Sequence, residues 1–207
     1  MAQIGELQLP ADVTVPAQAR GVVIFAHGSG SSRLSPRNRQ VARYLNQGSF
    51  ATVLFDLLTE AEAADRRNVF DIPLLAERMS QAIAFAQNHR SLHTLPIGLF
   101  GASTGAAAAL VAAARHGHEI AAVVSRGGRP DMAGATLGQV KAPTLLIVSG
   151  EDGDVLELNR RAARQLHCVK RLEIVAGATH LFEEPGMLDR VMALAADWFT
   201  IYFGARP

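Results

Sequence analysis

The stretch Gly101-Ala102-Ser103-Thr104-Gly105 decides how this chain is interpreted. It follows the apolar run at residues 95–100 and precedes a run of small residues at 106–115, which is typical of a helix. A G-x-S-x-G motif between a strand and a helix is typical of a sharp turn that exposes a nucleophilic serine. Such a turn strains the serine backbone, and the flanking glycines leave room for the close approach of the chain. We therefore predict that Ser103 is a nucleophile.

Apolar runs of strand length alternate with helical segments along the chain. Unbroken apolar runs are typical of strands that are covered on both faces. Strand–helix alternation predicts an α/β fold, with a doubly wound, mostly parallel sheet of about six to seven strands flanked by helices. The predicted strands are residues 22–26, 51–55, 97–100, 120–124, 144–148 and 171–175, with 4–9 as a further antiparallel strand, and the predicted helices are residues 35–45, 75–86, 106–115, 155–166 and 187–203.

Composition agrees with a compact enzyme but does not identify one. The 207 residues are 49% hydrophobic and 19% charged, which predicts a single domain spanning residues 1–207 and argues against disorder. A formal net charge of +1 gives no electrostatic reason to expect nucleic acid or a membrane surface as partner. The single cysteine, Cys168, excludes a disulfide framework and a cysteine-rich metal site. The first residues lack the pattern of a signal peptide, so we expect a cytoplasmic location.

Ligands of a doubly wound sheet bind beyond the carboxyl ends of its strands. Polar residues that directly follow the apolar runs are therefore the candidates for function. This criterion selects His27-Gly28-Ser29-Gly30, Asp56, Ser103, the segment 125–129, Asp152 and His180.

A serine hydroxyl needs a general base, and histidine suits that role because its pKa lies near neutral pH. His180 follows the last predicted strand and precedes the final helix, and Asp152 follows the strand before it. The acid fixes the tautomer of the imidazole and stabilises its cation. We predict a catalytic triad of Ser103, Asp152 and His180. Glu151 and Asp154 are the alternatives for the acid, although Asp154 could instead cap the helix that follows it.

The oxyanion that forms on the substrate must also be stabilised. One donor is predicted to be the backbone N–H of Thr104, next to the nucleophile. The second is predicted to be the N–H of Ser29, in the loop after residues 22–26, with Gly28 and Gly30 lining the substrate site. His27 is interpreted as a structural residue that supports this loop, and Asp56 as one that organises residues 57–71.

Together the HGSG loop, the GASTG elbow, the acid after Gly150 and the histidine before the last helix resemble the α/β-hydrolase superfamily. Within it the chain resembles the small lidless dienelactone hydrolase-like serine esterases, from about residue 22 to its end. Dienelactone hydrolases proper carry a cysteine at the elbow, and Ser103 at that place favours ordinary carboxylic esters. Relatives with a large cap insert it after the strand that ends near Val124. Only about twenty residues separate Val124 from Thr144, so the resemblance implies no cap domain and a shallow, open pocket.

Several arginines occupy the loops expected around the site. Arg126 and Arg129 follow residues 120–124, while Arg33, Arg66 and Arg67 lie in two other loops. If they converge, they form an anion-binding rim for a carboxylate or phosphate on the substrate. The favoured alternative is that they are solvated or paired with Asp131, Asp65, Glu60 and Glu62. Arg126 and Arg129 stand as candidate substrate-binding residues.

The function predicted from these residues is hydrolysis of carboxylic esters, with short acyl chains, through an acyl-enzyme on Ser103. No metal or organic cofactor is expected, and the expected partner is a small ester, with the chain acting as a monomer or homodimer. A thioesterase, peptidase or acyltransferase would use the same triad. A hydrolase-like protein that only binds a ligand is the remaining alternative.

Overall fold

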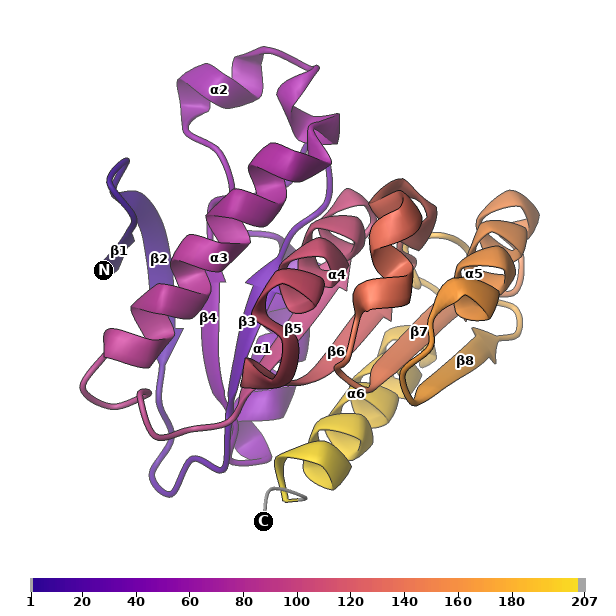
Figure 1. The fold of residues 1–207 in the computed structure, drawn as a ribbon. Helices are drawn as coiled ribbons and strands as arrows, with labels where there is room; N and C mark the ends of the chain where they lie inside the picture. The colour runs from indigo at the N-terminus through magenta and orange to yellow at the C-terminus, as the bar shows by residue number, and fades with distance from the viewer. Residues whose placement is uncertain (1, 205–207) are drawn as a thin grey trace.

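The computed structural model describes residues 2–204, and one sheet of eight strands runs through that part of the chain (Figure 1). The spatial order of the strands is β1-β2-β4-β3-β5-β6-β7-β8. Strands β3 to β8 are parallel. For β3 to β7 this agrees with their apolar runs, whereas β8 alternates in sequence and lies at the edge of the sheet. The strands are β1 (Ala2–Ile4), β2 (Leu9–Thr14), β3 (Val22–Ala26), β4 (Ala51–Phe55), β5 (Ile97–Ala102), β6 (Ile120–Arg126), β7 (Thr144–Ser149) and β8 (Lys170–Val175).

The start of the described chain differs from the sequence prediction. Residues 4–9 do not form one strand, because they contain the turn of a hairpin in which Ile4 pairs with Leu9. Gly5 and Gln8 both have positive φ angles, of 67° and 52°, and the N–H of Gln8 donates to the carbonyl of Gly5 at 3.0 Å. The hairpin contributes two antiparallel strands, β1 and β2, so the sheet exceeds the predicted six to seven strands.

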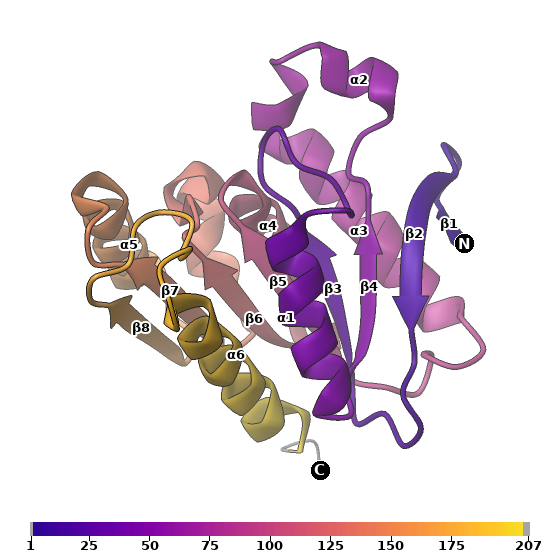
Figure 2. The same cartoon turned by 180° about the vertical axis from the view of Figure 1, so that it is seen from behind.

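Helices cover both faces of the sheet (Figures 1 and 2). On one face lie α3 (Ile72–Asn88), α4 (Thr104–His116) and α5 (Gly153–Gln165), and on the other lie α1 (Pro36–Gln47) and α6 (Met187–Phe203). The remaining helical elements are α2 (Glu60–Ala64) and the 3-10 segments η1 (Asn68–Phe70), η2 (Gly117–Glu119) and η3 (Pro130–Gln139). This doubly wound arrangement confirms the predicted fold class, and the described residues contain no separate cap domain.

Each face of the sheet has its own apolar core. The core under α3, α4 and α5 includes Met79, Leu99 and Leu110, all of them fully buried. The core under α1 and α6 is richer in aromatic residues, such as Phe100 and Phe199. Gly98 on β5 is needed there, because a Cβ at this position would lie 2.5 Å from the ring of Phe199.

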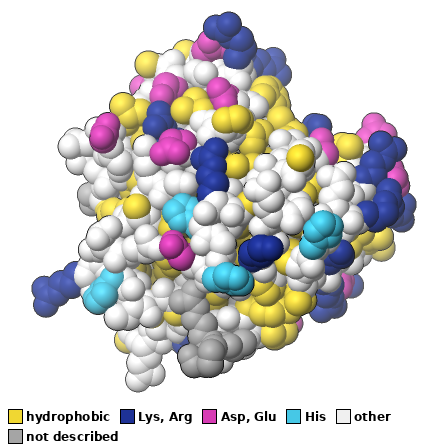
Figure 3. All heavy atoms as spheres, in the orientation of Figure 1, with side chains coloured by type: hydrophobic (Ala, Val, Ile, Leu, Met, Phe, Trp, Pro, Cys, Tyr) yellow, Lys and Arg dark blue, Asp and Glu magenta, His cyan; other side chains and the backbone are white. Residues whose placement is uncertain are grey.

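The carboxyl ends of the parallel strands share one edge of the sheet, and α2 stands beyond that edge (Figures 1 and 2). On the surface shown in Figure 3, basic side chains gather where α5 lies, and both signs of charge occur around α2. Within residues 2–204 no helix is both long and apolar enough to cross a lipid bilayer.

The predicted site residues follow the parallel strands, so they should meet at the carboxyl edge of the sheet.

Candidate active site

Ser103 occupies the strained turn that the sequence predicts between β5 and α4. Its backbone has φ 51° and ψ −124°, a conformation that a residue with a Cβ rarely adopts. The two motif glycines pack where no side chain fits. A Cβ on Gly101 would lie 2.4 Å from the Cα of Ala106, and a Cβ on Gly105 would lie 2.4 Å from the carbonyl oxygen of Ala26. The surrounding packing thus keeps Ser103 at the carboxyl edge of the sheet.

His180 and Asp152 come together as predicted. The Nδ1 of His180 lies 2.6 Å from Oδ2 of Asp152, a distance at which the ring N–H donates to the carboxylate. Asp152 precedes α5 but its side chain makes no capping bond to that helix, which leaves the carboxylate to the imidazole. Glu151 and Asp154, the two alternatives for the acid, are both exposed. The contact orients Nε2 away from Asp152, which is the nitrogen a general base needs.

Backbone bonds join the two loops that carry this pair. The N–H of Gly150 donates to the carbonyl of Val175 at 2.9 Å, and that of Glu151 donates to Ala178 at 3.1 Å. Phe182, two residues after the histidine, is fully buried and has a φ of 55°. A buried ring on a strained residue anchors the histidine loop to the core under α6.

Ser103 and His180 line the same cavity, of about 240 Å3, which we call the serine cavity. Among the described residues no hydrogen bond joins the Ser103 hydroxyl to the imidazole. Catalytic hydrogen bonds are often long in unliganded sites and shorten when substrate binds. Other residues that line the serine cavity are Gly28, Ser29, Ser31, Ser35, Arg37, Asn38, Arg126, Gly127 and Leu181.

The loop after β3 passes directly over the nucleophile. A Cβ on Gly28 would lie only 2.9 Å from the Cβ of Ser103, so this close approach requires glycine. Ser29 follows in an exposed turn closed by the bond from the Ser31 N–H to the Gly28 carbonyl, at 3.2 Å. Thr104, the first residue of α4, is buried, and its N–H lies among the helix-start groups that have no partner inside the helix.

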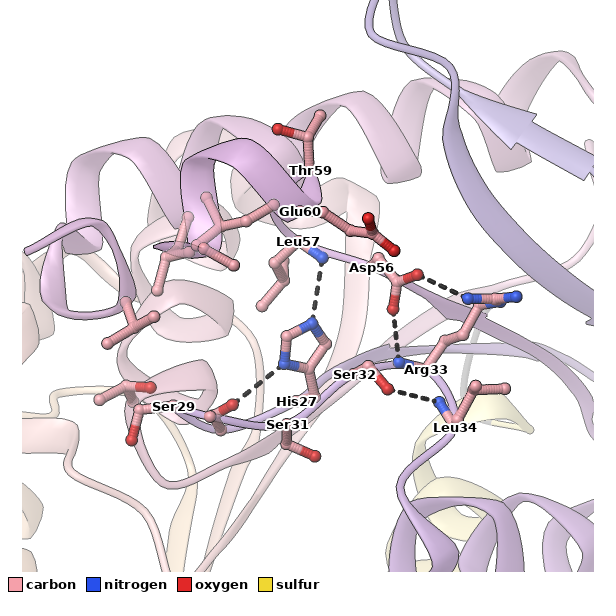
Figure 4. Close-up of a pocket in the computed structure, with 17 residues that line it drawn as sticks. His27, Ser29, Ser31, Ser32, Arg33, Leu34, Asp56, Leu57, Thr59 and Glu60 are labelled. Atoms are coloured by element: carbon pink, nitrogen blue, oxygen red, sulfur yellow. Dashed lines mark hydrogen bonds and ion pairs between the residues drawn. The ribbon is translucent and has the colours of Figure 1, made fainter. Parts of the chain in front are cut away.

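His27 and Asp56 hold this loop in place (Figure 4). The Nε2 of His27 accepts the N–H of Leu57 at 3.1 Å, and its Nδ1 lies 3.0 Å from the carbonyl of Gly28, to which it donates in that tautomer. Asp56 accepts both the backbone N–H and the Nη1 of Arg33, each at 2.7 Å. His27 is therefore structural, as predicted. Asp56 was predicted to organise residues 57–71, but its carboxylate instead binds Arg33 in the loop after β3.

Burial lowers the pKa of His27 below its ordinary value of 6.5, although the Gly28 carbonyl and the Asp56 carboxylate oppose that shift. The ring consequently stays neutral at neutral pH. A neutral imidazole has one donor and one acceptor, which matches the two bonds that His27 makes. The same ring would lose its bond from Leu57 on protonation.

Figure 4 shows a second cavity, of about 400 Å3, which shares Gly28, Ser29 and Ser31 with the serine cavity. We call it the α2 cavity. Both predicted oxyanion donors, Ser29 and Thr104, line it, as do Gly28 and Gly30. Most of its lining surface is apolar, with Leu57, Leu58, Ala63 and Val69 from the segment between β4 and α3 and Leu75 from α3, and the charged residues Arg33, Asp56 and Glu60 also line it. Residues 57–71, which we call the roof, thus contribute to the wall of this cavity. The expectation of a shallow, open pocket stays a prediction.

Glu62 ties this roof to the body of the protein. It forms a capping box with Thr59 at the start of α2 and an ion pair with Arg78 of α3, whose Nη2 lies 2.8 Å from its Oε1. Burial would raise the pKa of Glu62, but the Thr59 amide and the Arg78 guanidinium lower it overall. The carboxylate is therefore charged at neutral pH and holds α2 against α3.

Only one of the loop arginines named from the sequence reaches the serine cavity. Arg129 is held by Asp131, with its Nη2 2.8 Å from Oδ2, and lines neither cavity. Arg67 pairs with Asp65 at 2.6 Å, Arg33 is held by Asp56, and Arg66 is exposed. The five arginines therefore do not converge into one rim, in line with the favoured alternative, and of these five Arg126 alone lines the serine cavity.

Two residues of the serine cavity, Arg37 and Asn38, were missed by the sequence prediction. Both lie in the first turn of α1, after the cap at Ser35. Asn38 is 2% exposed, and its Oδ1 has no hydrogen-bond partner. The proline after Ser35 indicated the start of a helix, but nothing in the sequence indicated that this start faces Ser103.

The fold, the strained serine and the His180–Asp152 pair define a hydrolase of the α/β class. The sequence model of the family described as "Alpha/beta hydrolase domain" matches residues 19–193, and the chain belongs to that family. A dienelactone hydrolase from Anabaena variabilis ATCC 29413 is 50% identical, with a TM-score of 0.94 over 98% of this chain and 97% of that one. The chain is thus dienelactone hydrolase-like, as its motifs indicate.

More distant and differently named relatives complete the comparison. Est1E from Butyrivibrio proteoclasticus, solved with bound ferulic acid, shares the fold, with a TM-score of 0.81 at 15% identity over 95% of this chain and 96% of that one. A Mycobacterium tuberculosis H37Rv protein named "Putative phosphoribosyl transferase" is 56% identical over 195 residues, which are 94% of this chain. The chain spans only 44% of that protein's length.

Proposed function

We propose that this protein hydrolyses carboxylic esters through an acyl-enzyme on Ser103. The observation that carries the proposal is the 2.6 Å contact between Asp152 and His180, because His180 lines the same cavity as Ser103 on its strained turn. A nucleophile, a base and an orienting acid are the three groups that acyl transfer requires. The esterase and the dienelactone hydrolase among the structural relatives support the same reaction class.

In the first half-reaction, the Oγ of Ser103 attacks the ester carbonyl carbon while Nε2 of His180 takes the hydroxyl proton. The negative charge that develops on the carbonyl oxygen is stabilised by the N–H groups of Ser29 and Thr104. The bond between the carbonyl carbon and the alcohol oxygen then breaks. The alcohol leaves with the proton from His180, and the acyl group stays on Ser103.

In the second half-reaction, water attacks the acyl carbon and gives a proton to His180. The bond to Oγ breaks, and the proton returns to Ser103 as the acid leaves. Asp152 stabilises the imidazolium in both halves without being protonated itself. The residues of this chain thus complete the cycle with water as the only co-reactant.

We do not carry the transferase name of the mycobacterial relative over to this chain. The matched segment is less than half of that protein, and the family model for this segment is that of a hydrolase. The Ser103, Asp152 and His180 side chains have a role in acyl transfer, whereas none is needed to transfer a phosphoribosyl group. Ester hydrolysis is therefore the proposal that the site supports best.

The test is to label the protein with a serine-directed fluorophosphonate and to measure hydrolysis of 4-nitrophenyl acetate. We expect one labelled residue, Ser103, and a fall in kcat of several orders of magnitude in Ser103→Ala, with an unchanged melting temperature. Ser91→Ala, an exposed serine in the turn after α3, is the matched control and should behave as wild type.

Labelling of another residue, or near-normal turnover by Ser103→Ala, would contradict the assignment of the nucleophile. A parallel panel of an oxygen ester, a thioester and an anilide with the same acyl group then compares the possible substrates. The proposal requires that the oxygen ester has the highest kcat/KM of the three.

A further inference from the structure

Arg126 is a buried cation that the ester-hydrolysis mechanism does not use. It ends β6 beside the elbow, where it pairs in register with Ala102, and its carbonyl accepts the N–H of Ser103 at 3.4 Å. The residue is 8% exposed, it lines the serine cavity, and its Nη1 has no hydrogen-bond partner. Arg126 therefore brings a buried guanidinium group to the cavity that Ser103 also lines.

No carboxylate within residues 2–204 forms an ion pair with Arg126. Burial and the neighbouring charge of Arg37 lower its pKa to about 10, so the group still carries its charge at neutral pH. A buried charge without a counter-ion is unfavourable, and a like charge beside it adds to the cost. A bound anion would supply the missing counter-ion and would offset the repulsion between Arg126 and Arg37.

Arg37 brings a second cation to the same cavity from α1. Its closest carboxylate is that of Glu183, with Nη1 3.8 Å from Oε2, and the Glu183 side chain is 63% exposed. An exposed pair at this distance is a weak one. The serine cavity consequently has more positive charge than the protein balances.

We propose that the serine cavity binds a carboxylate or phosphate group of the substrate on Arg126 and Arg37. This inference rests on the proposed ester hydrolysis and adds a substrate class to it. The planar guanidinium donates parallel bonds that match both kinds of oxyanion.

The two cavities accommodate different parts of the proposed substrate. They share Gly28, Ser29 and Ser31 as a common wall; of the two proposed oxyanion donors, Ser29 lies in that wall, and Thr104 lines the α2 cavity next to Ser103. An ester whose carbonyl sits there extends its anionic end into the serine cavity and its apolar end into the α2 cavity. The substrate class is therefore an amphiphilic ester with one small anionic group.

The experiment compares matched esters with and without an anion. The substrates are 4-acetoxybenzoate, 4-acetoxyphenylphosphonate and neutral methyl 4-acetoxybenzoate, with 4-nitrophenyl hydrogen succinate and its methyl ester placing the anion on the acyl side. We expect wild-type kcat/KM to be roughly 10- to 100-fold higher for at least one anionic ester than for its neutral partner, the range expected for a charge-assisted bond. The phosphonate and carboxylate arms show which oxyanion is preferred.

Arg126→Gln and Arg37→Gln test which residues cause that preference. Arg126→Gln should lower the anionic-to-neutral ratio at least tenfold while keeping kcat/KM for the neutral ester within about threefold, and Arg126→Lys should restore part of the ratio. Arg37→Gln should lower it less, because Arg37 is more exposed. Arg43→Gln, an exposed arginine on the same helix, is the matched control and should leave the ratio unchanged.

A binding measurement keeps this inference separable from the proposed reaction. Calorimetry with benzoate and with phenylphosphonate should show binding to wild type and at least tenfold weaker binding to Arg126→Gln. If the neutral ester is hydrolysed but no anion is preferred or bound, the anion subsite is refuted and the hydrolase remains. Equal losses for anionic and neutral esters in Arg126→Gln would also refute it, since that is the result of a purely structural role.

Discussion

The substitution Gly28→Ala tests how tightly the loop after β3 must pass over the nucleophile. The new Cβ would lie 2.9 Å from the Cβ of Ser103 and 3.3 Å from the carbonyl oxygen of Ala102. Carbon atoms pack best at about 3.5–4.0 Å, so the loop must move by roughly 0.6–1.1 Å. That motion displaces the neighbouring N–H of Ser29, the proposed oxyanion donor.

A displacement of about 1 Å costs roughly 100-fold in rate, and loss of one oxyanion donor costs about 100- to 1,000-fold. We expect kcat of Gly28→Ala to fall about 100-fold, which is about 2.7 kcal/mol of transition-state stabilisation. KM should change little, because the donor acts on charge that develops only in the transition state. The exposed loop should allow the variant to fold normally.

The assay is hydrolysis of 4-nitrophenyl acetate alongside thermal denaturation. Gly138→Ala is the matched control, because a Cβ there would meet its nearest neighbour, Cε1 of His167, at an ordinary 3.5 Å. Gly138 lies in η3 and lines neither cavity, so this variant should keep full activity. A Gly28→Ala enzyme that retains kcat within threefold of wild type would refute the assignment of this loop to oxyanion stabilisation.

Three further outcomes follow from the described contacts. Asp152→Asn should lower kcat by about 1,000- to 10,000-fold in the same assay, while Asp154→Asn should not, and equal losses would make the choice of acid wrong. Burial lowers the pKa of His27 from 6.5, so the contribution of the neutral ring to stability is present above pH 6.5 and is lost as pH falls. Urea unfolding should therefore show a lower free energy of unfolding at pH 5 than at pH 7, by up to about 1.4 kcal/mol per pH unit. The loss should be smaller in His27→Gln. Glu62→Gln removes the ion pair between α2 and Arg78 and should raise KM for long-chain esters by about two- to fivefold without changing KM for acetates. Equal KM values of the variant and the wild type for long-chain esters would show that α2 does not cover the substrate.

The parallel strands and the triad were predictable because both leave local marks in the sequence. Strands buried on two faces have unbroken apolar runs, which identified five of the predicted parallel strands, and the alternating segment 171–175 matches the edge strand β8. Ser103, Asp152 and His180 each follow a predicted strand, and chain order together with the elbow glycines distinguished them from other polar residues. The roles of these residues in catalysis stay predictions.

The α2 cavity could not be predicted, because α2 has only five residues and buries none of them. A helix this short has no apolar periodicity, and its one local mark is the capping box of Thr59 and Glu62. Arg126 and Arg129 pose a different problem. They lie three positions apart in the same glycine-rich segment, and only the packing around them makes one a buried cation and the other a partner of Asp131.

The aromatic helix α6 makes the seating of the His180 loop depend on one packing step. The face of the sheet that holds Phe25 and Phe100 is covered by α1 and α6 together. While α6 is unpacked, α1 alone covers that face, and the apolar surface left open favours aggregation or chaperone capture. The loop with His180 directly precedes α6, and Phe182 belongs to the same core. A folding chain that has already formed its serine elbow therefore lacks a seated His180 until α6 packs against the sheet.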